Sequence, residues 1–225
     1  MKKYYAIIVA GGSGNRMQSA EAKQFLLLDG LPILMHTIKA FADCILKPQL
    51  LLVLNIHQQQ YWEELCTKYN FTVPHEVVKG GQERFHSVQN ALKFIKTTGI
   101  VAIHDAVRPL VSTSLIENSF LVAEEKGNAV AAVHPTDSIR IAEYDRSKAV
   151  DRDKVYLIQT PQTFQAAQLK KAYLQPFRNG FTDDAAVVEH AGFEINLVEG
   201  ERENLKITYP VDLALATMIR QKKGS

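Results

Sequence analysis

Residues suited to binding a phosphate gather first in a glycine-rich turn near the start of the chain, AGGSGNRM. Gly11, Gly12 and Gly14 lie close together there, Arg16 follows them, and Lys23 comes shortly after. Glycine lets the main chain approach a ligand closely, and the N–H groups of such a turn can surround a phosphate. Two cations beside backbone donors suit a polyphosphate whose charge shifts during a reaction. The alternative is that both cations are ordinary surface side chains.

This turn matches neither of two familiar phosphate-binding patterns. A Walker A loop needs four residues between its glycines and then Gly-Lys-Ser/Thr, which the stretch lacks. In a dinucleotide fingerprint that begins at Gly12, Met17 stands where a small residue must let helix and strand pack closely. No acidic residue ends a second strand about 20 residues further on, as that fingerprint requires. An NAD-dependent dehydrogenase is therefore a distant alternative.

Two later stretches place polar residues after other predicted strands. VKGGQERFHSV holds a second glycine turn, which brings the Gly81 backbone and the Ser87 hydroxyl toward the same edge of the sheet. AIHDAVRP ends a buried strand at Asp105 and continues to Arg108. A carboxylate there suits a ribose hydroxyl, a metal or a substrate hydroxyl; the alternative is a structural pair with Arg108 or a helix cap. His104 is expected to be a packed strand residue.

The last polar stretches contain GFTDDAAVVEH and ENLKITYPVDL. Thr182 begins a helix whose first turn holds Asp183 and Asp184, and capping explains both acids. Lys206 lies in a short apolar, strand-like segment, where it either faces solvent or binds a phosphate. The histidines form no metal-ligating pattern, and no nucleophile elbow or Cys/His pair is present.

The composition restricts the class of protein. The 225 residues include 26 basic and 24 acidic ones, and this near balance gives no signal for nucleic acid or an anionic membrane. Cys44 and Cys66 form no C-x-x-C pair, so reduced thiols are expected. The first apolar run is too short for a signal peptide, and none approaches the ~20 residues that span a bilayer. We expect a cytoplasmic protein.

Apolar runs of strand length alternate with helical patterns, which predicts one α/β domain, residues 1–225, with a mostly parallel sheet flanked by helices. The predicted strands are Tyr5–Ala10, Leu50–Asn55, Thr72–Val78, Ile100–His104, Ala129–His134 and Phe193–Val198. The predicted helices are Ile33–Phe41, Gln58–Tyr69, Arg84–Lys96, Thr113–Lys126, Gln165–Gln175, Asp183–His190 and a last one after Pro210.

The region of about residues 135–159 interrupts this alternation. PTDSIRIAEYDRSKAVDRDKVYLIQ has two short alternating runs around a polar centre, as a β-hairpin does, and too few apolar residues for a core of its own. A projecting arm of this kind suggests a partner surface and hence an oligomer. A solvated hairpin on a monomer fits the pattern equally well.

Six motifs, taken together, resemble the 2-C-methyl-D-erythritol 4-phosphate cytidylyltransferase family. They are AGGSGNRM with KQF, GGQERFHSV, HDAVRP, QTPQTF, TDDAAVVEHAG and EGERENLKIT, and they follow in order over nearly the whole chain. The resemblance implies a Rossmann-like nucleotidyltransferase fold with a mostly parallel twisted sheet, and a homodimer joined by a projecting β-arm. It also implies cytidylyl transfer from CTP to a polyol phosphate, with Mg²⁺ carried mainly on the CTP phosphates rather than on protein ligands.

The resemblance also implies roles for individual residues. The catalytic cations would be Arg16, Lys23 and Lys206. CTP would be bound by Ala10, Gly11, Gly12, Gly14, Gly81, Gln82, Ser87 and Asp105. The polyol phosphate would be held by Asp105, Arg108, Thr160 and Thr182, with Arg152 reaching it from the arm of the partner subunit.

Two departures from the family pattern bear on the acceptor and the base. Gly11 stands where many relatives have alanine, and the glycine form also occurs in ribitol-5-phosphate cytidylyltransferases. Gln82 stands where some relatives have aspartate. The later motifs favour methylerythritol phosphate as the acceptor over ribitol 5-phosphate. From another class, a non-catalytic nucleotide-binding module is the remaining alternative.

Overall fold

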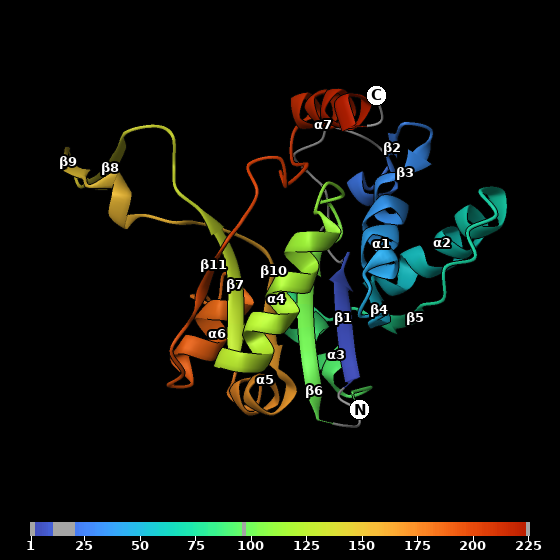
Figure 1. The fold of residues 1–225 in the computed structure, drawn as a ribbon, viewed down its shortest axis with the longest axis horizontal. Helices are drawn as coiled ribbons and strands as arrows, with labels where there is room; N and C mark the ends of the chain where they lie inside the picture. The colour runs from blue at the N-terminus through green and yellow to red at the C-terminus, as the bar shows by residue number, and fades with distance from the viewer. Residues whose placement is uncertain (1–2, 11–20, 96–97, 224–225) are drawn as a thin grey trace.

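The computed structural model describes residues 3–10, 21–95 and 98–223. The predictions for Gly11, Gly12, Gly14 and Arg16 concern residues outside these ranges. The described chain forms a sheet covered on both faces by helices, from which a two-stranded arm projects (Figure 1).

The central sheet has seven strands. Their spatial order is β11 (Leu197–Glu199), β7 (Asn128–Val133), β10 (Leu157–Gln165), β6 (Gly99–Asp105), β1 (Lys3–Val9), β4 (Gln49–Leu54) and β5 (Glu76–Lys79). Every neighbouring pair is parallel except the two that involve β10, which runs antiparallel to both β6 and β7. The predicted mostly parallel sheet is confirmed, although the strands predicted at residues 72–78 and 193–198 are shorter than expected.

β10 is not among the predicted strands of the sheet, because its buried centre is polar. Gln159, Thr160, Gln162 and Thr163 are all buried in this strand, so it lacks the apolar run of a central strand. The side chain of Gln162 finds partners within the fold: its amide donates to the Asp183 carboxylate at 3.0 Å and accepts from the main chain at 2.8 Å. Such bonds let a polar strand lie in a sheet interior.

The helices divide between the two faces of the sheet. Alternate residues of β1 point to opposite faces, Ala6 and Ile8 to one and Tyr5 and Ile7 to the other. The first face packs against α1 (Ile33–Asp43), α2 (Ile56–Lys68) and α4 (Thr113–Lys126). The second packs against α3 (Arg84–Leu92), α5 (Ala166–Ala172) and α6 (Asp184–His190).

The ends of α4 follow directly from its sequence, and its predicted bounds are correct. The Ser112 hydroxyl accepts from the N–H of Leu115 at 3.0 Å, as an N-cap does. Gly127 ends the helix at a φ of 96°, a conformation that glycine adopts without strain. The last helix, α7 (Pro210–Lys223), packs with Val107, Leu110 and Ile207 in a smaller apolar cluster.

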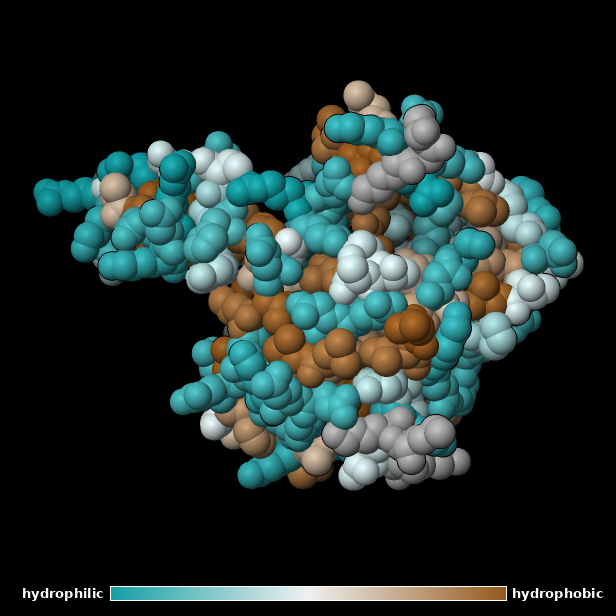
Figure 2. All heavy atoms as spheres, in the orientation of Figure 1, coloured by the Kyte–Doolittle hydropathy of each residue, from teal (hydrophilic) through white to brown (hydrophobic). Residues whose placement is uncertain are grey.

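The arm is a hairpin of β8 (Ile139–Glu143) and β9 (Arg146–Val150), followed by the short helix η3 (Arg152–Lys154). It stands away from the sheet, and its surface is mostly hydrophilic with a small hydrophobic area (Figures 1 and 2). The predicted β-hairpin is confirmed, except that residues 157–159 already belong to β10. Among the described helices none has the length and apolar character to cross a bilayer.

Candidate active site

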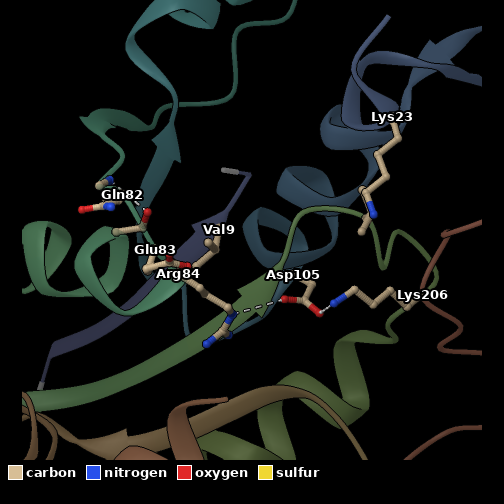
Figure 3. A pocket seen from close by; sticks show the side chains of 10 residues that line it. Val9, Lys23, Gln82, Glu83, Arg84, Asp105 and Lys206 are labelled. Atoms are coloured by element: carbon tan, nitrogen blue, oxygen red, sulfur yellow. Dashed lines mark hydrogen bonds and ion pairs between the residues drawn. The ribbon is translucent and has the colours of Figure 1, made fainter. Parts of the chain in front are cut away.

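A pocket of about 370 Å³ opens at the carboxyl ends of β1 and β6. On one side of β1 the sheet continues with β4 and β5, and on its other side lies β6. The loops that follow β1 and β6 therefore diverge at this point, which is where open α/β sheets bind ligands. The pocket is lined by Val9, Lys23, Gly81, Gln82, Glu83, Arg84, Ser87, Asp105, Val107 and Lys206 (Figure 3). It therefore brings together six of the predicted site residues, namely Lys23, Gly81, Gln82, Ser87, Asp105 and Lys206.

Asp105, the last residue of β6, is the buried acid of the pocket. Its carboxylate lies 2.9 Å from Lys206 Nζ, 3.6 Å from Arg108 Nε and 3.7 Å from Arg84 Nε. Figure 3 shows Arg84 and Lys206 approaching this carboxylate from two sides. Burial raises the pKa of Asp105, but Arg84, Lys206 and Arg108 outweigh it and hold the pKa well below its usual range. Asp105 is therefore ionised at neutral pH.

Lys206 reaches Asp105 from an irregular loop, so the predicted strand-like segment is wrong. A backbone bond from Ile207 N–H to Val107 O, at 2.9 Å, joins this stretch to the turn after β6. Side chains hold the rest of the loop: the fully buried Asn204 donates to Thr160 O at 2.8 Å and faces Gln159 Oε1 at 3.4 Å. These contacts aim Lys206 at Asp105 while leaving its side chain 45% exposed.

The Gly81 turn is held against the start of α3. The N–H of Gly81 donates to Ser87 Oγ at 3.0 Å, and Ser87 itself is buried. A Cβ built on Gly81 would overlap the backbone and Cβ of His86, so only glycine fits at this close approach. The adjacent Gln82 is exposed at the pocket.

Lys23 enters the pocket from the short helix η2 (Lys23–Phe25), which is fixed to the end of β1. The buried Gln24 donates to Ala10 O at 3.1 Å and to Gln58 Oε1 at 3.0 Å. Ala10 is itself buried, and its N–H donates to Val53 O at 2.9 Å. Gln24 therefore links Ala10, which precedes the glycine-rich stretch, to the short helix η2 that carries Lys23.

Arg84 is a pocket residue that the sequence did not reveal. Its Nη2 lies 2.6 Å from Asp184 Oδ2, while its Nε faces Asp105. The prediction that capping explains Asp184 is wrong, because Asp184 is completely buried against Arg84 and Tyr173. Asp183 is the cap of α6, with Oδ1 accepting from the main chain at 2.8 Å. The ion pair joins residues 100 positions apart, so no local sequence pattern could predict it.

Thr160 and Arg108 are buried beside the pocket rather than among its lining residues. Thr160 Oγ1 accepts from the N–H of Asp105 at 3.1 Å and lies 3.1 Å from His104 Nδ1. Arg108 Nη1 donates to Asn204 O at 2.7 Å. Both side chains thus already have partners in the fold.

His104 is a packed strand residue, as predicted. Burial lowers its pKa to about 4, so the ring is neutral at pH 7. Its Nε2 lies 3.1 Å from the carbonyl of Arg108, which can only accept, so Nε2 carries the proton and Nδ1 accepts from Thr160.

Thr182 and Arg152 lie apart from the described lining of the pocket. Thr182 is exposed and precedes the Asp183 cap, so it does not begin α6 as predicted. Arg152 belongs to η3 on the arm, where its Nη1 donates to Thr136 O at 3.0 Å.

The described residues include no group of three His, Cys, Asp or Glu side chains that could hold a metal ion. Asp105 and Glu83 are the carboxylates of the pocket lining, and Asp105 already has three cationic neighbours. This donor set does not form a protein-built cage for a divalent cation.

Comparison with known proteins places the chain in a family. Residues 4–222 match the family model described as 2-C-methyl-D-erythritol 4-phosphate cytidylyltransferase. The protein of that name from Porphyromonas gingivalis (strain ATCC 33277) is 49% identical over 220 residues, covering 97% of this chain and 98% of the relative. Its counterpart from Bacteroides fragilis is 45% identical over 214 residues, covering 95% and 98%.

A solved structure gives the same result. The 4-diphosphocytidyl-2C-methyl-D-erythritol synthase from Anaerococcus prevotii matches with a TM-score of 0.83 and 27% identity, over 98% of this chain and 96% of that one. The chain therefore belongs to the 2-C-methyl-D-erythritol 4-phosphate cytidylyltransferase family.

Proposed function

We propose that the chain transfers the cytidylyl group of CTP to 2-C-methyl-D-erythritol 4-phosphate and releases pyrophosphate, in non-mevalonate isoprenoid biosynthesis. One observation assigns this activity to the pocket: Lys23, Lys206 and Asp105 line it together with the Gly81 turn, at the carboxyl ends of β1 and β6. A polyphosphate needs cations and close backbone there, and the pocket offers both.

In the proposed reaction a phosphate oxygen of the acceptor attacks the α-phosphorus of CTP in line. The new P–O bond forms as the bond to the β-phosphate oxygen breaks, and that oxygen leaves with pyrophosphate. A phosphomonoester is already ionised near neutral pH, so no side-chain nucleophile or strong base is required. Positioning and charge stabilisation are the protein's main contributions.

Each part of the pocket has a role in this proposal. Lys23 and Lys206, with Arg16 from the glycine turn, offset the repulsion between two polyanions and the charge that develops at the α-phosphate. Asp105 accepts hydrogen bonds from sugar hydroxyls. Arg108 and Thr160 support that end of the pocket from beneath, and Thr182 lies beyond the lining, where the acceptor would have to extend to meet it.

The Gly81 turn and Ser87 suit the cytosine base. Ser87 Oγ accepts from Gly81 N–H, which leaves the Ser87 O–H to donate to an acceptor on the base, the carbonyl O2 or the ring N3. The exposed Gln82 amide can both donate and accept at the edge of the base. Ala10 and the glycines that follow it, Gly11, Gly12 and Gly14, would line the ribose and the phosphates.

Mg²⁺ would come bound to the triphosphate. It prefers phosphate oxygens and water, with one or two carboxylates at most, and the described lining of the pocket lacks a cage of its own. When bound, it supplies charge neutralisation at the phosphates.

We also propose a homodimer in which the arm of one subunit completes the site of the other. The hairpin and the strand that returns from it expose apolar side chains, Ile141, Tyr144, Tyr156 and Leu157. Arg152 lies on this arm, outside the pocket lining of its own chain, so a partner's pocket is where it would meet the acceptor's phosphate.

The test of the activity is release of pyrophosphate from CTP with each of two acceptors, methylerythritol phosphate and ribitol 5-phosphate. We expect turnover with the first. Turnover with ribitol 5-phosphate alone would reassign the acceptor, and CTP binding without pyrophosphate release would indicate a non-catalytic nucleotide-binding module.

Lys23→Ala tests the cationic role of the pocket. We expect a fall in kcat on the order of 10²-fold, or ~3 kcal/mol of transition-state stabilisation, with a much smaller rise in KM. Arg16→Ala should behave alike. The exposed Lys93, which is not a lining residue, gives the matched control Lys93→Ala. Near-normal turnover of Lys23→Ala would contradict the assignment.

A further inference from the structure

The strongest unexplained feature beside the pocket is a completely buried carboxylate behind it, Asp184. Both of its oxygens have a partner: Oδ2 accepts from Arg84 Nη2 at 2.6 Å, and Oδ1 accepts from the Tyr173 hydroxyl at 2.6 Å. Asp184 is the first residue of α6, but Asp183 already serves as the cap, so helix capping leaves Asp184 unexplained.

Arg84 connects this buried acid to the pocket. It is the first residue of α3, directly after the Gly81 turn, and its side chain is 28% exposed. One end of the guanidinium meets Asp184, and Nε lies 3.7 Å from Asp105 Oδ1. The guanidinium is planar and rigid, so fixing one end of it fixes the direction of the other.

The neighbouring charges keep both Arg84 and Tyr173 protonated. Burial lowers the pKa of Arg84, but Asp184 and Asp105 outweigh it and raise the pKa above its ordinary value, so Arg84 stays cationic. Burial, and then the neighbouring Asp184, raise the pKa of Tyr173, so its hydroxyl keeps the proton that it donates. Without Asp184 the guanidinium would lose its anchor and be free to turn toward the pocket or its phosphates.

We propose that Asp184 and Tyr173 form a positioning pair that acts through Arg84 to fix the Asp105 carboxylate where it meets the substrates' sugar hydroxyls. The inference rests on the proposed function for its final link, the contact between Asp105 and substrate. Asp184 and Tyr173 touch no substrate. Their role is to keep Nε of the Arg84 guanidinium directed at Asp105 and away from the triphosphate.

A double-mutant cycle separates this role from simple support of the fold. Asp184→Asn keeps the shape of the side chain and removes the charge, and we expect kcat/KM for CTP to fall about tenfold or more. In an Asp105→Asn background the same change should lower kcat/KM less than about threefold, because the group that it positions is already altered. Equal losses in both backgrounds would overturn the proposal.

Tyr173→Phe provides a milder variant in case Asp184→Asn folds poorly. It removes one hydrogen bond from Asp184 and leaves the ion pair, so a loss of about two- to fivefold in kcat/KM is expected, again suppressed by Asp105→Asn. Two outcomes count against the proposal. One is an unchanged kcat/KM in Tyr173→Phe, and the other is a loss of kcat/KM that is equally large in the Asp105→Asn background.

Gln175→Ala is the matched structural control. Gln175 joins the end of α5 to α6 by donating to Ala172 O and Val187 O, both at 2.8 Å. Among the described residues, Arg84 is not one of its hydrogen-bond partners. We expect it to lower Tm and to leave kcat/KM unchanged. The unchanged chain is assayed first: absence of pyrophosphate release there would refute the proposed function, whereas normal release with an additive cycle would refute only this inference.

Discussion

The Asp105 carboxylate is the point at which distant segments of the chain meet through single side chains. Arg84 comes from the start of α3, Arg108 from the turn after β6, and Lys206 from a loop about 100 residues later. Each cation alone would carry a cost of burial, and the shared anion offsets that cost. The resulting cluster presents one half-exposed ammonium, that of Lys206, to a ligand.

His104 should make the stability of the protein depend on pH. Its pKa is about 4 in the fold, below the 6.5 of the unfolded chain, so the unfolded state binds more protons as pH falls through this range. The contribution is therefore present above pH 6.5 and is lost toward pH 4. We expect the free energy of unfolding in urea to fall by about 2 kcal/mol between pH 7 and pH 5 on account of this group.

His104→Gln should reduce that slope, because glutamine cannot charge and its amide can still donate to Arg108 O. His36, whose pKa burial also lowers, would continue to contribute in the variant. His57→Gln, at an exposed position on α2, is the control and should keep the original slope. An unaltered slope in His104→Gln would show that other groups govern the acid response.

At the scale of whole elements, two of the segments that deliver pocket residues are loops, and each depends on a small number of contacts. The turn before α3 depends on the absence of a side chain at Gly81, and the loop that carries Lys206 depends on the buried amide of Asn204. Both loops can therefore be displaced by one substitution outside the reacting groups.

Gly81→Ala should displace the turn before α3. The added methyl overlaps His86, and such overpacking costs about 1–3 kcal/mol when neighbours must shift. We expect the KM for CTP to rise about tenfold, because a shift of the turn breaks the Gly81–Ser87 bond beside the proposed base site. Gly180→Ala meets open space and should leave KM unchanged. Steady-state kinetics on the two variants compares them, and equal KM values would place the base elsewhere.

Asn204→Ala should loosen the loop that carries Lys206. It removes the donor that bonds the carbonyl of Thr160 and one of the two donors that face Gln159 Oε1, at a cost of about 1–3 kcal/mol in stability. We expect kcat to fall as well, and to fall no further when Lys206→Ala is combined with it. Asn196→Ala, at a bonded position near β11, should lower Tm and leave kcat intact. Strictly additive losses in the double variant would argue against a link through Lys206.

The elements differ in how far the sequence could predict them. The bounds of α4 follow from Ser112 and Gly127, since a cap and a positive φ are local events. β10 escaped prediction because the partners of its polar side chains come from distant parts of the chain. The pocket residues differ in the same way. Asp105 and the Gly81 turn could be predicted from local motifs, whereas the pairing of Arg84 with Asp184 could not, because the two residues are distant in the sequence.

For the molecule as a whole, the arm determines whether one chain suffices for activity. We expect the protein to be a dimer by light scattering, and mixed dimers to reveal the role of Arg152. Lys23→Ala subunits mixed with Arg152→Ala subunits would form heterodimers in which one site keeps both residues. If the site is shared, about a quarter of the activity of the unchanged dimer should return, because random pairing makes half of the dimers mixed.

The parent dimers provide the controls for this experiment. Each alone should be nearly inactive, since every one of its sites lacks either Lys23 or Arg152. No recovery on mixing, with subunit exchange verified by differently tagged chains, would mean that Arg152 acts within its own subunit. An active Arg152→Ala parent would mean that Arg152 has no role in the site.

The insertion of β10 between β6 and β7 has a consequence for synthesis of the chain. β6 and β7 follow one another in sequence and run in the same direction, yet they do not pair, because the place between them belongs to a strand made later. At about 5–20 residues per second, a ribosome needs roughly 3–12 s to add the approximately 60 residues from the end of β6 to the end of β10. During that interval the nascent sheet carries an apolar strand with one edge open, and it is then that the chain is most exposed to mispairing.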